Sequence, residues 1–213
     1  MMTNSISPLV RLVDDDYTVL DALTVFLEMA DMTVRRYSSA QAFLNEDDTD
    51  IPGVLVLDVR MSGMSGIELQ AEMKRRKIDL PIIFLSAHGD IEMAAEAVRA
   101  GAMNFLVKPP KPEKLLALIR EAVVKSIEDR RGKRYGNSLV KLWETLTPAE
   151  RQVAGMVAKG LGNAVVAEAL SVAERTVRSH KESIYRKLEV ENAVELSDFL
   201  RDLDTYGRQE TEL

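Results

Sequence analysis

The first 125 residues alternate between short runs of aliphatic and β-branched residues and longer segments with apolar residues three and four positions apart. The short runs predict strands, and the longer segments predict helices. Strands that alternate with helices along a chain form a parallel sheet covered on both faces. We therefore expect an α/β fold, a flavodoxin-like (βα)5 sheet with strand order 2-1-3-4-5. The predicted strands are 9–13, 33–37, 53–57, 81–85 and 104–107.

The segments between these strands predict five helices. Either Ser38 or Ser39 can cap the short second one. The predicted helices are 19–27, a short one after residue 39, 67–76, 91–100 and 112 to about 130.

The sequence after residue 145 keeps only the helical period, which predicts a small all-α domain of four helices. Thr147, Pro148 and Glu150 form a capping-box pattern that begins the first of them, and Gly160 ends it. Asn163 can cap the second helix. Two of these helices, joined by a short turn at 171–173, form a helix-turn-helix pattern. The predicted helices are 148–159, 164–170, 174–188 and 193–203.

The length of 213 residues suits two small domains better than one. Residues 126–137 are polar and basic and contain two glycines, which predicts the end of a long helix that runs into a linker. A further amphipathic turn is expected at 139–143. We place the first domain at 6–125, a helical and basic linker at 126–143, and the helix-turn-helix domain at 144–207.

Composition excludes several classes of protein. The chain has no cysteine and only two histidines, His88 and His180, so thiolate sites, disulfide scaffolds and multi-histidine metal sites are excluded. No secretory leader is visible, and the apolar runs fall far short of the roughly 18–20 residues that span a bilayer. We expect a soluble, cytoplasmic protein with no membrane partner. The net charge of −6 argues, taken alone, against a nucleic-acid-binding protein.

Residues that can carry chemistry follow four of the five predicted strands, and the second strand is followed by Ser38 and Ser39, which say little about function. The carboxyl ends of the strands in an open α/β sheet are where ligands bind, so we expect these side chains to share one site. In strand order, the residues are Asp14, Asp15 and Asp16, then Asp58, then Ser86, then Lys108.

Gathered carboxylates repel one another, and a divalent cation such as Mg²⁺ relieves that repulsion. A lysine beside them can neutralise phosphoryl oxygens, and a carboxylate can itself become an aspartyl phosphate. The pattern favours magnesium-dependent phosphoryl transfer onto an aspartate. Three aspartates after a strand also commonly form only a turn or a helix cap. The presence of such residues after four strands together favours a functional site.

The predicted helix 174–188 carries five basic and two acidic side chains, a net charge of +3. Small threonine and serine residues between arginines and lysines suit a helix that enters the major groove of DNA. Charge alone is more typical of an ordinary solvent-exposed helix face. Residues 145–213 together hold 9 basic and 12 acidic side chains. We therefore expect weak, salt-sensitive DNA binding by a monomer and a dependence on dimerisation.

Four motifs carry a resemblance to a known family: Leu12–Val–Asp–Asp, Val56–Leu–Asp–Val–Arg–Met with Gly63, Ser65 and Gly66 behind it, Ser86–Ala–His–Gly–Asp, and Phe105–Leu–Val–Lys–Pro. Together they resemble the receiver domain of two-component response regulators, over about residues 6–125. The resemblance implies that Asp58 accepts phosphate from a sensor histidine kinase. It also implies a site for Mg²⁺ or another divalent cation, formed by Asp14, Asp15, Asp58 and the backbone carbonyl of Arg60, with Asp14 acting largely through water.

The same resemblance assigns roles to the remaining residues of the site. Lys108 would pair with Asp58 at rest and with the phosphoryl group afterwards, and the peptide bond that follows it would be cis. Ser86 would bind a phosphoryl oxygen, and Phe105 would rotate inward with it. Ser62 stands where the family usually has proline. His88 is expected to have a structural or surface role.

A second set of motifs lies in the C-terminal region: Leu146–Thr–Pro–Ala–Glu–Arg, Gly160, Asn163, Val166–Ala–Glu–Ala–Leu–Ser–Val, Arg175–Thr–Val–Arg–Ser–His and Tyr185–Arg–Lys–Leu–Glu–Val. They resemble a LuxR-type helix-turn-helix domain, over about residues 143–205. With the receiver motifs, they give the arrangement of NarL/FixJ-type response regulators. The resemblance implies that Arg178, Ser179 and Glu182 face DNA bases. Residues implied to contact phosphates or hold the helix in place are Arg175, Thr176, His180, Lys181 and Lys187, and Asn163 is counted with the DNA-binding set.

The sequence thus predicts a phosphorylation-regulated transcriptional regulator that forms a homodimer when phosphorylated and binds promoter DNA. It is expected to catalyse only its own phosphorylation and dephosphorylation. The alternative is an adaptor or phosphate sink whose helical domain binds protein rather than DNA. The excess of acidic over basic side chains is compatible with this alternative. A hydrolase with Asp58 as nucleophile would need an open substrate pocket and a general acid, and the sequence indicates neither.

Overall fold

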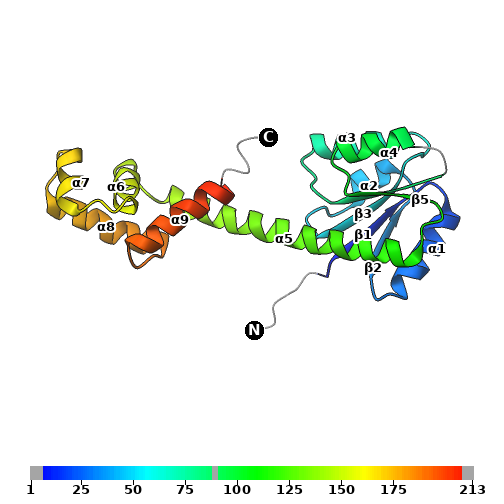
Figure 1. Ribbon diagram of the computed structural model, residues 1–213, viewed down its shortest axis with the longest axis horizontal. Helices are drawn as coiled ribbons and strands as arrows, with labels where there is room; N and C mark the ends of the chain where they lie inside the picture. The colour runs from blue at the N-terminus through cyan, green and yellow to red at the C-terminus, as the bar shows by residue number, and fades with distance from the viewer. Residues whose placement is uncertain (1–6, 88–90, 208–213) are drawn as a thin grey trace. The chain divides into compact units, whose positions relative to one another are not determined.

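The structure is a computed structural model that describes residues 7–87 and 91–207. Its contacts divide the chain into two units, one up to Arg130 and the other from Arg131 onward. The first unit holds a sheet between two layers of helices, and the second is helical (Figure 1).

The first unit is built on a parallel five-stranded sheet with the order β2-β1-β3-β4-β5. This confirms the flavodoxin-like fold and the strand order predicted from the sequence. The alternation of strand and helix segments produces a parallel sheet because the runs in β1, β3 and β4 are apolar enough to be buried on both faces. The strands are β1 (Leu9–Val13), β2 (Thr33–Tyr37), β3 (Gly53–Asp58), β4 (Ile82–Ser86) and β5 (Asn104–Val107).

The helices of this unit cover the two faces of the sheet (Figure 1). Neighbouring residues of β3 face opposite sides, so Val54 joins one core cluster and Leu55 joins the other. Helices α1 and α5 contribute to the cluster of Val54, and helices α2, α3 and α4 contribute to that of Leu55. The helices are α1 (Tyr17–Glu28), α2 (Ala40–Glu46), α3 (Gly66–Arg75), α4 (Ile91–Arg99) and α5 (Pro112–Glu144).

Short polar side chains begin these helices. Asp16 caps α1 by accepting a hydrogen bond from the Thr18 N–H, and Ser39 caps α2. The sequence left Ser38 and Ser39 as alternatives for the second cap, and the structure selects Ser39. Ser65 and Glu68 form a capping box at the start of α3.

Helix α5 is 33 residues long, and it continues beyond the end predicted near residue 130. The prediction of a separate amphipathic turn at 139–143 is wrong, because those residues belong to the same helix. Gly132 and Gly136 are the two glycines of the segment that was predicted to run into a linker. An added Cβ at Gly136 would lie 2.5 Å from the backbone oxygen of Tyr206, so glycine is needed there for close packing of helix α9 (Ala193–Tyr206).

The second unit has its own core, formed by α9, the end of α5 and three further helices. These helices are α6 (Pro148–Ala158), α7 (Asn163–Leu170) and α8 (Glu174–Leu188). The capping box of Thr147 and Glu150 at the start of α6 is present as predicted. Asn163 is not the cap of α7: the helix begins at Asn163, and Gly162 occupies the cap position without a side-chain hydrogen bond.

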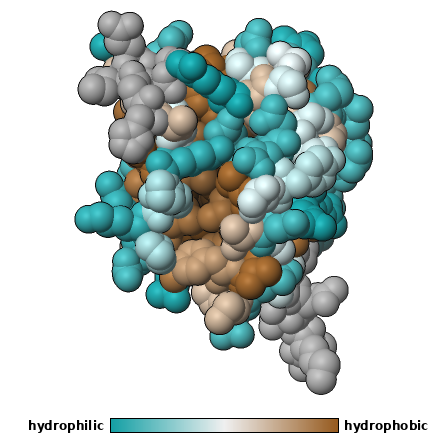
Figure 2. Space-filling model, turned by 90° about the vertical axis from the view of Figure 1, so that its right-hand side faces the viewer, coloured by the Kyte–Doolittle hydropathy of each residue, from teal (hydrophilic) through white to brown (hydrophobic). Residues whose placement is uncertain are grey.

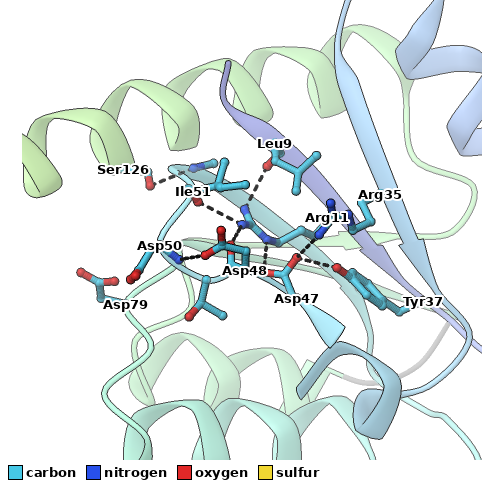
Figure 3. Close-up of polar contacts among 12 residues, drawn as sticks. Leu9, Arg11, Arg35, Tyr37, Asp47, Asp48, Asp50, Ile51, Asp79 and Ser126 are labelled. Atoms are coloured by element: carbon cyan, nitrogen blue, oxygen red, sulfur yellow. Dashed lines mark hydrogen bonds and ion pairs between the residues drawn. The ribbon is translucent and has the colours of Figure 1, made fainter. Parts of the chain in front are cut away.

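Arg11 lies in the middle of β1 with no exposed surface. Its Nε is 2.6 Å from Oδ2 of Asp47, and its Nη2 donates to the backbone oxygens of Asp48 at 2.7 Å and Ile51 at 3.0 Å (Figure 3). The hydroxyl of Tyr37 donates to the other oxygen of Asp47. A buried charge needs such partners, so this cluster fixes the segment between α2 and β3 against the sheet.

The surface is mixed in polarity. On the face drawn in Figure 2, apolar side chains gather around a hollow in the middle, and hydrophilic side chains surround them. Among the helices that the structure describes, none combines the length and the apolar character needed to cross a membrane.

Candidate functional site

The carboxyl edge of the sheet brings the predicted acidic residues and Lys108 together. Asp14 directly follows β1, Asp58 is the last residue of β3, and Lys108 directly follows β5. Because β1, β3, β4 and β5 are parallel, these chain positions meet at one edge. Carboxylate oxygens of Asp14, Asp15 and Asp58 lie within 4.8 Å of one another.

Lys108 joins the two buried carboxylates. Its Nζ is 2.6 Å from Oδ2 of Asp14 and 2.5 Å from Oδ1 of Asp58. Backbone N–H groups hold the other oxygens: the Asp16 N–H donates to Oδ1 of Asp14 at 3.0 Å, and the Arg60 N–H donates to Oδ2 of Asp58 at 2.9 Å. These bonds fix both carboxylates in position at the end of the sheet.

Burial and neighbouring charges shift the pKa values of this site in opposite directions. Burial raises the pKa of Asp58, and the hydrogen bond and charge of Lys108 offset only part of that rise. Burial by itself lowers the pKa of Lys108, but its bonds to Asp14 and Asp58 raise the pKa overall. Lys108 is therefore cationic at neutral pH. Three carboxylates beside one ammonium leave a net negative site made of oxygen ligands, which is the kind of ligand that Mg²⁺ prefers.

The other predicted residues of this site lie around the cluster. Ser86 is the last residue of β4, is buried, and donates from its hydroxyl to the backbone oxygen of Ala87 at 3.1 Å. Phe105 in β5 is half-buried, with its ring centre 6.4 Å from that of Phe84. The peptide bond between Lys108 and Pro109 is cis, as the resemblance implied. The role expected for His88 concerns a residue outside the described ranges.

The backbone N–H bonds to the carboxylates of the site were not predicted, and one of them reaches Asp15. The backbone N–H of Ser62, in the loop after β3, donates to Oδ2 of Asp15 at 2.7 Å. The signal was visible in the sequence, because proline has no N–H and a serine at this position does. Asp16, which the resemblance does not include among the cation ligands, caps α1.

Helix α8 presents most of the predicted DNA-binding residues in the second unit. Its apolar residues Val177, Ile184 and Leu188 are buried in the core, which turns the other side outward. The exposed residues of the predicted set are Arg175, Arg178, Ser179 and Glu182. The partly buried ones are Asn163, Thr176, His180, Lys181 and Lys187. The Nζ of Lys181 donates to the side-chain oxygen of Asn163 at 3.3 Å, which joins α8 to α7.

Lys187 has a partner inside the protein. Its Nζ lies 2.7 Å from Oε2 of Glu150, and the Ser183 hydroxyl donates to Oε1 of the same carboxylate at 2.6 Å. Glu150 is buried and also closes the capping box of α6 with Thr147. Of the two roles that the resemblance left for Lys187, these contacts support holding the helix in place. The sequence indicated the cap at Glu150 but not its bonds to α8.

We expect Glu150 to make the stability of the second unit depend on pH. Burial by itself raises its pKa, but hydrogen bonds from Lys187, Ser183 and Thr147 outweigh this and hold the pKa at about 2. Because that value lies below the ordinary 4.5, the ionised carboxylate stabilises the fold above pH 4.5, and this stabilisation is lost as the pH falls toward 2. Glu150→Gln should therefore lower the free energy of unfolding at pH 7, with a difference from the unmodified protein that narrows below pH 4.5.

Urea denaturation followed by the fluorescence of Trp143, which packs on the core of the second unit, measures this difference. Glu168→Gln, a change at an exposed glutamate of α7, is the matched control and should show no such gap. If Glu150→Gln lowers the free energy of unfolding by the same amount at pH 7 and at pH 3, the stabilising role of the ionised Glu150 carboxylate is contradicted.

Comparison with known proteins agrees with both units. A family model described as the response regulator receiver domain matches residues 10–120, and one described as bacterial regulatory proteins of the luxR family matches residues 144–200. The chain is 37% identical to the response regulator protein TodT of Pseudomonas putida, over 91% of this chain and 86% of that protein. It is 32% identical to the transcriptional regulatory protein FixJ of Bradyrhizobium diazoefficiens, over 88% of this chain and 91% of that protein.

A solved structure supports the same assignment. The response regulator StyR is 37% identical to this chain, with a TM-score of 0.86 over 92% of this chain and 98% of that one. The receiver-type sheet, the helix-turn-helix unit and these relatives lead to one conclusion. The chain belongs to the NarL/FixJ-type response regulators, which join a receiver domain to a LuxR-type DNA-binding domain.

Proposed function

We propose that this response regulator accepts a phosphoryl group on Asp58 from a sensor histidine kinase in the cytoplasm, and that phosphorylation controls its dimerisation and its binding to promoter DNA. The observation that carries the proposal is the arrangement of Asp14, Asp15, Asp58 and Lys108 at one edge of the sheet. Phosphoryl transfer needs positioning and charge neutralisation more than covalent chemistry from the protein, and this arrangement can supply both.

Each side chain of the site would have a separate role in phosphoryl transfer. A carboxylate oxygen of Asp58 forms a bond to phosphorus while the bond between phosphorus and the kinase histidine breaks, and the histidine nitrogen keeps that electron pair. Lys108 already binds Asp58 and would neutralise the added phosphoryl oxygens. Ser86 would donate a hydrogen bond to one of those oxygens, and Phe105 would rotate inward as Ser86 moves.

A divalent cation such as Mg²⁺ fits the donor set. Asp14, Asp15 and Asp58 offer only oxygen ligands, and the backbone carbonyl of Arg60 would add another. When bound, the cation would neutralise charge that develops on the transferred phosphoryl group.

In the second domain we propose that α8 enters the major groove. Arg178, Ser179 and Glu182 would face base edges, and their exposure supports that role. Residues that would contact phosphates or support the helix are Asn163, Arg175, Thr176, His180 and Lys181, with Lys187 in a supporting role through Glu150.

Replacing Arg178 by alanine should weaken binding to the operator by about 1–3 kcal/mol and relax the preference at one base pair, because an arginine that reads a base edge supplies both. Gel-shift titration against the operator and its single-base variants measures both effects. Arg201→Ala changes an exposed arginine of α9 in the same unit and should leave the affinity unchanged. Unchanged affinity for Arg178→Ala would remove this residue from the base-reading set.

The proposed function as a whole is tested by size-exclusion chromatography and genomic DNA pull-down, each with and without acetyl phosphate. We expect phosphorylation to produce a dimer and to enrich specific promoter fragments, because two linked half-sites multiply weak contacts. The alternative, an adaptor or phosphate sink, is supported by the acidic balance of residues 145–213, with 9 basic and 12 acidic side chains. Phosphorylation without enrichment of any DNA would favour that alternative.

A further inference from the structure

We propose that the backbone N–H of Ser62 positions the Asp15 carboxylate for a divalent cation. The N–H donates to Oδ2 of Asp15 at 2.7 Å, across the gap between the loop after β1 and the loop after β3. The inference rests on the proposed function, because it takes Asp14, Asp15 and Asp58 as the cation site. It concerns a residue at which this chain departs from the receiver pattern, in which proline is usual.

Asp15 is held differently from the other two carboxylates. Asp14 and Asp58 are buried, both contact Lys108, and each has a backbone N–H on its remaining oxygen. Asp15 has one hydrogen bond to the part of the chain that the structure describes, and the donor is Ser62. This bond uses Oδ2 and leaves Oδ1 for a cation. Without it, the described structure provides no other polar contact that orients this side chain toward the cluster.

The loop that carries Ser62 is fixed at both ends. The Arg60 N–H binds Asp58, and the Gly66 N–H donates to the Val59 carbonyl at 2.9 Å. An added Cβ at Gly66 would lie only 2.2 Å from the backbone oxygen of Asp58, so the loop returns tightly against the end of β3. The capping box of Ser65 then starts α3. The loop can therefore hold the Ser62 N–H in a fixed place toward Asp15.

The physical effect is preorganisation. An aspartate that is already oriented loses less side-chain freedom when it binds a cation. Removal of a hydrogen bond that supports a metal ligand typically weakens metal affinity by about 10–100-fold. The Ser62–Asp15 bond is solvent-exposed, so we expect the lower end of that range, about tenfold.

Two substitutions at one position separate the N–H from the side chain. Ser62→Pro removes the N–H, and Ser62→Ala keeps it while removing only the hydroxyl. Mn²⁺ binding to the full, unphosphorylated chain is measured by electron paramagnetic resonance of the free ion, with the free energy of unfolding without metal as a parallel measurement. We expect Ser62→Ala to bind within about twofold of the unmodified protein and Ser62→Pro to bind about tenfold more weakly. The unfolding free energies of the two variants should agree.

A double-mutant cycle tests whether Ser62 acts through Asp15. In an Asp15→Asn background, Ser62→Pro should cause no further loss of Mn²⁺ affinity. A further tenfold loss in that background, equal affinities of Ser62→Pro and Ser62→Ala, or tighter binding by Ser62→Pro would each overturn the inference. Absence of Mn²⁺ binding by the unmodified chain would instead overturn the proposed cation site itself, and the inference with it.

If Ser62→Pro does not fold, the amide signal of Ser62 in a ¹⁵N-labelled chain provides the second test. Hydrogen bonding to a carboxylate moves an amide proton downfield, so Asp15→Asn should move this signal upfield, whereas Asp16→Asn should not. A Ser62 amide that does not respond to Asp15→Asn would reject the contact.

Discussion

Asp58→Asn is expected to abolish labelling of the protein by acetyl phosphate. The substitution keeps the size of the side chain but replaces the carboxylate oxygen that would form the bond to phosphorus with a weakly nucleophilic amide. Lys108 keeps its contact with Asp14, so the remaining cluster should stay in place. Labelling is measured as the mass increase of one phosphoryl group in the intact protein after incubation with acetyl phosphate and Mg²⁺.

Asp16→Asn is the matched control for this experiment. Asp16 lies two residues from Asp14 and caps α1, and asparagine caps a helix as well as aspartate does. This variant should be labelled as the unmodified protein is. Labelling that persists in Asp58→Asn would show that another residue accepts the phosphoryl group, and the site assignment would be wrong.

The second large effect is expected from Arg11→Met. This change removes the closer of the two ion pairs of Asp47, whose side chain has 0% exposure, and leaves it with Arg35 at 3.9 Å and the hydroxyl of Tyr37. It also removes the donor to the carbonyls of Asp48 and Ile51. Removing one partner of a buried ion pair costs about 3–5 kcal/mol, because the other charge stays buried without compensation. We therefore expect the free energy of unfolding of the first unit to fall by about 3–5 kcal/mol.

Two controls accompany this measurement by urea denaturation and circular dichroism. Arg36→Met breaks an ion pair with Asp21 in which both side chains are exposed, and it should cost at most about 1 kcal/mol. Trp143, the only tryptophan, reports on the second unit, and its fluorescence transition should not move in Arg11→Met. If Arg11→Met and Arg36→Met lower the free energy of unfolding equally, the buried cluster around Arg11 does not stabilise the first unit as proposed.

The sequence was sufficient for the features that depend on local pattern. Alternating periods predicted the sheet, and the residues after the strands predicted that Asp14, Asp58 and Lys108 would meet, because parallel strands share one carboxyl edge. The cap at Thr147 also follows from short-range chemistry, which narrowed the cap of α2 to Ser38 or Ser39.

Features that depend on distant contacts could not be predicted in this way. Arg11 in the middle of β1 has no acidic partner in the local sequence, since Asp47 lies 36 residues away. The bond between Glu150 and Lys187 joins residues 37 apart. Gly136 was interpreted as part of a segment that runs into a linker, but close packing against Tyr206 explains it. In each case tertiary packing, which a single sequence does not display, decides the role of the residue.

Helix α5 has a consequence for how the chain loses its structure. Its first part packs into a core of the first unit through Leu115 and Ile119, and its last part packs into the core of the second unit through Leu139. A helix in water has little stability without such packing, so melting of one core should fray the part of α5 that it supported. Cooperativity is then a property of each unit, and one melting temperature does not describe the whole chain.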